Sequence, residues 1–94
     1  MNIDALRKTG ELQGHHWLAI RWFEESWPRR QSRIAIGRAC RNVEASLACG
    51  GIDPFVLLHR AIVARETLSH DPKVIGVLRE TLNAVYRMRP RIEH

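Results

Sequence analysis

Arginines are the residues of this sequence whose type and spacing most clearly suggest a function. Arg30, Arg33, Arg38 and Arg41 recur at short intervals, which places them on one side of a predicted helix. A guanidinium group binds carboxylates and phosphates through paired hydrogen bonds. The row therefore predicts a surface for an acidic protein, or a non-specific surface for the phosphates of DNA or RNA. A solvated helix face without a partner is the third interpretation.

Trp22 is the second candidate for contact with a partner. It falls on the outward side of a predicted helix whose inward face carries Trp17 and Phe23. An exposed tryptophan can anchor a protein interface, and it can also stack on a nucleic-acid base or on an arginine of its own chain. Plain packing in a fold with a broad core is the alternative.

His59 and Glu66 are the pair with the best spacing for catalysis. They lie seven residues apart on one face of a predicted helix, where a His–Glu pair could act as an acid–base dyad. Such a pair more often fixes the register of a core or of a dimer. The sequence contains no glycine-rich phosphate loop and no nucleophile elbow. It therefore predicts a protein that is not an enzyme, with a small helical enzyme as the remote alternative.

The histidines and cysteines do not predict a metal or cofactor site. His15 and His16 are adjacent, so their side chains point about 100° apart on a helix and rarely share one ion. Metal-binding spacings such as H-x-x-x-H and C-x-x-C do not occur. Cys40 and Cys49 fall on one predicted helix about 13 Å apart, which disfavours a disulfide and predicts small, buried, reduced side chains.

Four helical segments joined by short loops are predicted to position these residues. Asp-Pro pairs begin the last two segments, and a Gly-Gly pair ends the second. No stretch alternates apolar and polar residues between turn signals as a strand does. By apolar spacing, the segments cover about 3–26, 32–49, 54–68 and 72–88.

Three of these segments bear on the architecture. Gly10 and Gly14 interrupt the first, so it forms either one helix or two. The third is apolar almost all the way round, which predicts that it is central in the fold or covered by another chain. The last has the apolar spacing of an antiparallel seam. Together they predict an all-α fold, a compact helical bundle of about four helices.

Length, composition and charge exclude several classes of protein. The 94 residues predict a single helical domain over 1–94, with a short basic tail from about residue 89. The 45% hydrophobic content excludes a disordered chain, and no apolar run is long enough to cross a bilayer. Residues 1–14 lack the apolar region of a secretory signal, so a cytoplasmic protein is expected. Most of the surplus positive charge falls within residues 27–52.

The sequence as a whole predicts a small non-enzymatic binding protein that acts as an adaptor, regulator or inhibitor. It is expected to form a homodimer and to meet an acidic partner through the arginine row. A nucleic-acid accessory protein that uses the same arginines is the alternative, and phosphate binding would weaken steeply with salt. The composition suits a bacterial or mobile-element factor. No cofactor, metal or membrane is expected among its partners.

Overall fold

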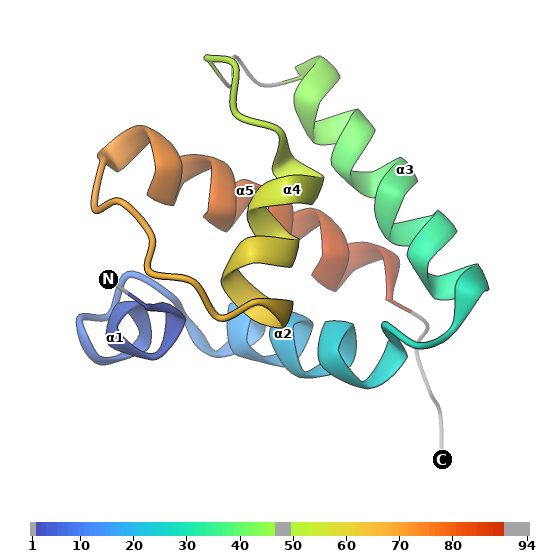
Figure 1. Ribbon diagram of the computed structural model, residues 1–94, viewed down its shortest axis with the longest axis horizontal. Coiled ribbons are helices and arrows are strands. Elements are labelled where there is room, and N and C mark those ends of the chain that lie inside the picture. The colour runs from blue at the N-terminus through green and yellow to red at the C-terminus, as the bar shows by residue number, and fades with distance from the viewer. Residues whose placement is uncertain (1, 47–49, 90–94) are drawn as a thin grey trace.

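Helices form all the regular secondary structure in the part of the chain that the computed structural model describes, residues 2–46 and 50–89. The all-α prediction is therefore confirmed. The π-helical turn η1 continues α4 without a break, and the other helices are joined by turns or loops. In chain order the elements are α1 (Ile3–Lys8), α2 (Gly14–Ser26), α3 (Arg30–Ser46), α4 (Pro54–Leu58), η1 (His59–Val63) and α5 (Pro72–Met88), as Figure 1 shows.

The first predicted segment is two helices separated by a turn. α1 ends at Lys8, and Gly10 then adopts a φ of 78°, a left-handed conformation that glycine reaches without strain. α2 begins after Gln13, whose backbone N–H donates a hydrogen bond to Nδ1 of His16 over 3.0 Å. Of the two possibilities for residues 3–26, the structure selects the break.

The last predicted segment is correct at both ends. Asp71 caps α5, because its side chain accepts a hydrogen bond from the backbone N–H of Lys73 over 2.8 Å, and Pro72 occupies the first turn.

The second predicted segment corresponds to α3, which begins two residues earlier than predicted and is helical to Ser46. Its predicted last turn, with Cys49, and the basic tail beyond residue 89 lie outside the described residues.

The third predicted segment is shorter than expected. The helix was predicted to continue to Leu68, but α4 and η1 together end at Val63. Arg65 has a φ of 54°, a left-handed conformation that a non-glycine residue rarely adopts and that cannot continue a helix. The chain therefore turns at Arg65 and reaches α5 through a loop, in which Leu68 is buried.

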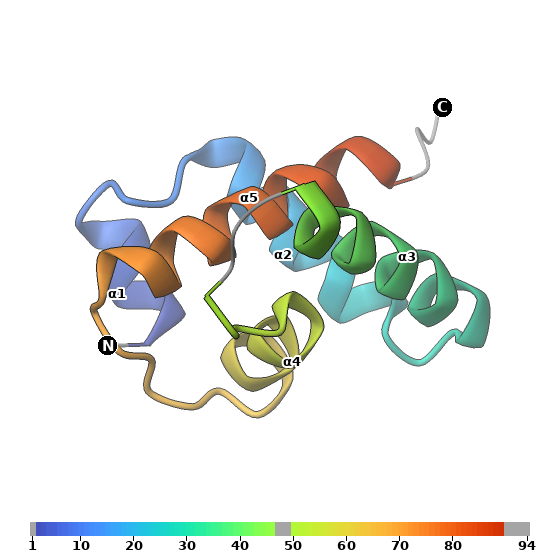
Figure 2. The same cartoon turned by 90° about the horizontal axis from the view of Figure 1, so that it is seen from above.

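α5 is the central helix of the fold. It packs against α2, α3 and α4, and α4 crosses in front of it in Figure 1. Figure 2 shows from above that α4 lies to one side of α5, while α2 crosses behind α5 in this view. The prediction of a central third segment is thus wrong. That segment keeps an outer face, on which Val56 and Val63 are 47% and 40% exposed, while its inner face packs on α5.

The core draws side chains from every described helix. Along α5, the predicted seam is buried at Leu78, Thr81 and Val85, and its end positions Val74 and Met88 are half-buried. Burial of this apolar surface is the main force that holds the helices together. Among the fully buried side chains are Leu6, Phe23, Ile36, Leu58, Leu78, Thr81 and Val85.

Candidate functional site

A groove runs between α3 and the start of α4, and three of the four predicted arginines line it. The groove has a volume of about 650 Å³. α3 turns one face to the core, so the side chains of its other face project outward beside α4. Arg33, Arg38 and Arg41 give the groove its positive charge, and Ile34 and Phe55 give it apolar surface.

Arg33 is held in place by the turn between α2 and α3. Its Nη1 donates a hydrogen bond to the carbonyl oxygen of Trp27 over 3.0 Å, and its guanidinium lies 5.9 Å from the centre of that indole ring. The side chain is half-buried, so it is the least mobile of the groove arginines. A guanidinium that is already oriented loses less entropy when it binds an anion.

Trp27 also positions the opposite wall of the groove. Its ring centre lies 5.1 Å from that of Phe23, 5.8 Å from that of Phe55 and 5.4 Å from that of His59. These contacts connect the end of α2 to α4 and to the first residue of η1. No local sequence signal predicts this role of Trp27, because its partners come from separate elements.

Arg30, Arg38 and Arg41 are exposed, and none of them forms a hydrogen bond or ion pair with another described residue. Arg38 stands between the groove and a second hollow of about 510 Å³ between α3 and α5. Arg30, at the first residue of α3, does not line the groove. Of the predicted row, Arg33, Arg38 and Arg41 therefore share a groove with α4, and Arg30 lies outside it.

Two carboxylates, Glu44 and Asp53, also line the groove. Asp53 caps α4, because its Oδ1 accepts hydrogen bonds from the backbone N–H groups of Phe55 (2.9 Å) and Val56 (3.3 Å). Its charge is thus directed largely at the helix N-terminus. Glu44 lies on α3 itself, about one turn after Arg41, so the positive charge of the groove lies along α3 from Arg33 to Arg41 and the acids lie at its other end.

Cys40 borders the groove but is not a nucleophile. The side chain is free and buried. Burial, and then the negative charge of Asp53, raise the pKa of its thiol to about 12. A thiol that stays protonated at neutral pH is a poor nucleophile and a poor metal ligand, so Cys40 acts as a core side chain.

Trp22 does not join the arginines. It lies on α2, half-buried against the core, and does not line the groove. It is partly rather than fully exposed, since α2 packs against both α5 and η1 and a broader face of this helix than a single stripe is covered. Its role as an anchor for a partner stays a prediction. The alternative of packing in a broad core describes its environment.

His59 and Glu66 are not on one helix face, so this part of the prediction is wrong. Glu66 lies beyond the end of η1, where its carboxylate accepts hydrogen bonds from Nε (3.2 Å) and Nη2 (3.2 Å) of Arg60. The ring of His59 instead packs against Trp27. The cause is the early end of the helix, since seven residues place two side chains together only on a continuous helix.

His15 and His16 meet, contrary to the expected divergence. The Nε2 atoms of both rings lie near Oδ1 of Asn83, at 2.8 Å and 2.7 Å. Nδ1 of His16 accepts the Gln13 N–H, so its neutral ring carries the proton on Nε2 and donates it to Asn83. That nitrogen has no free lone pair for a metal ion. The arrangement joins α2 to α5.

No group of three or more His, Cys, Asp or Glu side chains that could hold a metal ion occurs among the described residues. No described helix has the length and apolar character needed to cross a bilayer. Comparison of the chain with protein families, curated proteins and solved structures finds no match.

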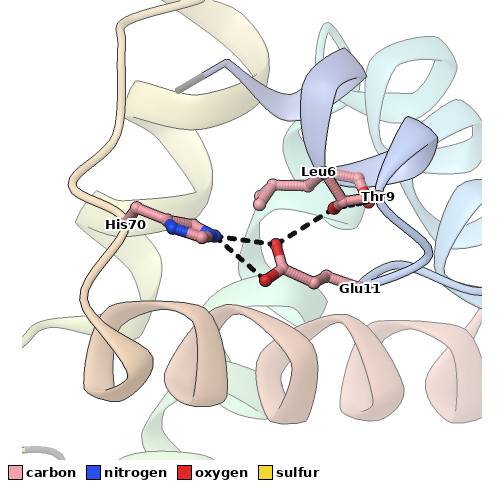
Figure 3. A network of polar contacts seen from close by, with 4 residues as sticks. All are labelled: Leu6, Thr9, Glu11 and His70. Atoms are coloured by element: carbon pink, nitrogen blue, oxygen red, sulfur yellow. Dashed lines mark hydrogen bonds and ion pairs between the residues drawn. The ribbon is translucent and has the colours of Figure 1, made fainter.

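Several polar and charged side chains pair between the loop before α5 and the N-terminal helices. His70 lies 2.9 Å from Oε1 of Glu11, and Figure 3 shows how Thr9 joins this contact from the turn after α1. Arg65 pairs with Glu24 at 3.3 Å and with Asp4 at 3.8 Å. These contacts connect the loop before α5 to the N-terminal helices.

Proposed function

We propose that this protein is a non-catalytic binding protein whose groove beside α3 binds an acidic surface of a partner protein. The role would be that of an adaptor, regulator or inhibitor. The observation that carries the proposal is that one groove is lined both by arginines without a partner among the described residues and by accessible apolar side chains. Ile34 is 42% exposed between the arginines, and Phe55 is half-buried opposite. An apolar centre beside charged groups is typical of protein interfaces.

Two features favour a protein over a nucleic acid. The carboxylates of Glu44 and Asp53 line the same groove and would repel a run of phosphates. A phosphate backbone also has no apolar side chain to cover Ile34. Nucleic acid is the second candidate, because Arg30, Arg38 and Arg41 have no partner in the described part of the chain along about 16 Å of helix.

A peptide-display selection on the full chain tests the proposal. A library of random 16-residue peptides is selected on the wild-type protein and counter-selected on the double variant Arg38→Glu/Arg41→Glu. We expect enrichment of acidic peptides that bind the wild type and not this variant. The matched control is Arg21→Glu/Lys73→Glu, which changes the net charge equally at exposed positions outside the groove and should retain binding.

A parallel titration with mixed-sequence duplex DNA decides between the two candidates. If no arginine-dependent peptide is enriched, while DNA binds through Arg38 and Arg41 with a steep salt dependence, the nucleic-acid function replaces the proposed one. Arginine-dependent peptides together with weak DNA binding support the proposal.

The predicted homodimer needs a separate measurement. Its premise was the apolar third segment, but Leu57, Leu58, Ala61 and Ile62 are buried within the chain. Val56 and Val63 remain as the exposed large apolar side chains of that segment. Light scattering behind a sizing column, at low and high salt, measures the oligomeric state. A dimer that Val56→Ser/Val63→Ser converts to a monomer would assign this face to the interface.

A further inference from the structure

Gly37, in the middle of α3, has no role in packing that the chain itself explains. A glycine inside a helix is less favourable than alanine, because more backbone freedom is lost on folding. A Cβ atom built at Gly37 would meet no other atom within 4 Å. Its φ is not positive, unlike those of Gly10, Gly50 and Gly51. Neither a close internal contact nor an unusual conformation therefore requires glycine here.

The position of Gly37 relates it to the groove. It lines the groove one helical turn after Arg33 and one turn before Arg41, so all three share one side of α3. The missing side chain leaves the helix backbone accessible between two guanidinium groups. Any side chain at this position would project into the space between α3 and Phe55.

The surroundings of Gly37 suit an apolar group from a partner. Ile34 is exposed three residues earlier on α3, and Phe55 is held opposite by its contact with Trp27. Arg33 is already oriented by the Trp27 carbonyl, and Arg38 and Arg41 have no described partner. The floor of the groove is thus open and partly apolar, and α3 is positive beside it from Arg33 to Arg41, before Glu44.

We propose that the groove binds an acidic segment of a partner protein that places one apolar side chain over Gly37, with flanking carboxylates on Arg33 and Arg41. The inference rests on the proposed function and names the part of the partner that is recognised. Charge complementarity selects the acidic segment, since the arginines of the groove form no ion pair with a carboxylate of residues 2–46 or 50–89. The volume of about 650 Å³ accommodates several side chains, so a segment rather than a single group fills it.

The test compares two glycine-to-alanine variants. Gly37→Ala adds a methyl group to the floor of the groove, and Gly76→Ala makes the same change inside α5, where a Cβ also meets nothing within 4 Å. Both variants should raise the melting temperature by about 4 °C or more, because alanine favours the helix. Only Gly37→Ala should weaken the selected acidic peptides, by about tenfold, and Gly37→Leu should weaken them further.

The peptides give a second readout. Replacing the single apolar residue of a selected peptide by serine should reduce its affinity for the wild type about tenfold. The same replacement should have a much smaller effect on binding to the Gly37→Leu variant, where the leucine side chain already occupies the space over residue 37. Fluorescence anisotropy of labelled peptides measures both series.

The possible failures are distinguishable. Suppose that Arg38→Glu/Arg41→Glu abolishes binding, but that neither Gly37→Ala nor the serine replacement in the peptides weakens it. The proposed function then stands, and the placement of an apolar side chain over Gly37 is overturned. A lower melting temperature for Gly37→Ala would show an internal role for the glycine and would also overturn the inference. If no arginine-dependent peptide can be selected, the inference and the proposed function both fail.

Discussion

The arginines of α3 and those near η1 are the same residue type in opposite situations. Arg60 and Arg65 pair with carboxylates at 3.2 Å and 3.3 Å, whereas Arg38 and Arg41 have no partner among the described residues. All four side chains are exposed. The difference is therefore not burial but which acidic residues the fold brings near. Arginines that form ion pairs within the chain contribute to its fold, and those without an ion pair are available to a partner.

This difference has a consequence for stability. Exposed ion pairs typically contribute roughly 0.2–1 kcal/mol, because water screens them and two flexible side chains must be ordered. Removing an unpaired exposed arginine costs even less. The groove can thus keep several free positive charges at little cost to the fold, and mutations there should act on binding rather than on unfolding.

The largest expected effect is on binding. Arg38→Glu/Arg41→Glu should weaken the selected acidic peptides about 100-fold, because each reversal replaces an attraction by a repulsion. Its unfolding free energy, measured in urea, should stay close to that of the wild type. Arg60→Glu/Arg65→Glu should lower the unfolding free energy, since each new carboxylate faces an existing one. This variant should bind the peptides as the wild type does. Equal loss of binding in both variants would show that net charge, not location, decides.

A buried polar contact should affect stability more than any of the exposed pairs. Asn83→Ala removes the acceptor of His16, a side chain that is 2% exposed. A buried N–H without a partner costs about 1–3 kcal/mol, so the unfolding free energy should fall by about that amount. Asn42→Ala, at an exposed position of α3, is the control and should change it little. Urea denaturation measures both, and an unchanged Asn83→Ala variant would contradict the importance of this contact.

The same histidine predicts a pH dependence. Burial lowers the pKa of His16 from its usual 6.5, and the charges of His15 and Arg79 add to the decrease, although the hydrogen bond to Asn83 opposes it. Protonation therefore favours the unfolded chain, in which the pKa is ordinary. The contribution of His16 to stability is complete well above pH 6.5, declines as the pH falls below it and levels off below the folded pKa.

Urea midpoints between pH 5 and pH 8 measure this effect. The difference in stability between the wild type and His16→Gln should shrink as the pH falls. A difference that is independent of pH would contradict the assignment to His16. Since His16 does not line the groove, the double variant Arg38→Glu/Arg41→Glu should show the same pH dependence as the wild type in this range.

The smallest expected effect concerns a single exposed pair. Arg65→Gln should lower the unfolding free energy by less than about 1 kcal/mol, through loss of the contacts with Glu24 and Asp4. Molar NaCl should remove most of the difference, because salt screens exposed charges. Arg41→Gln should show no measurable loss at either salt concentration. A larger, salt-dependent loss for Arg41→Gln would show that its charge has a partner within the chain.

Helix boundaries were predictable where a local signal acts. The Asp71 cap and Pro72 define the start of α5 within one turn, and Asp53 does the same for α4. The end of η1 was not predictable, because Arg65 adopts a left-handed conformation that its residue type disfavours. Tertiary contacts, including those of Arg65 with Glu24 and Asp4, accompany that conformation.

For the candidate site, the sequence by itself determined the arginine row, since spacing along one helix places these side chains on one face. It also determined where the capped helices α4 and α5 begin. Only the tertiary structure decided which arginines border a groove, that Trp27 orients Arg33 and Phe55, and that Trp22 packs against the core. The physical reason is range: caps and periodicity act within a turn or along one helix, whereas pairing and burial depend on residues far apart in the chain.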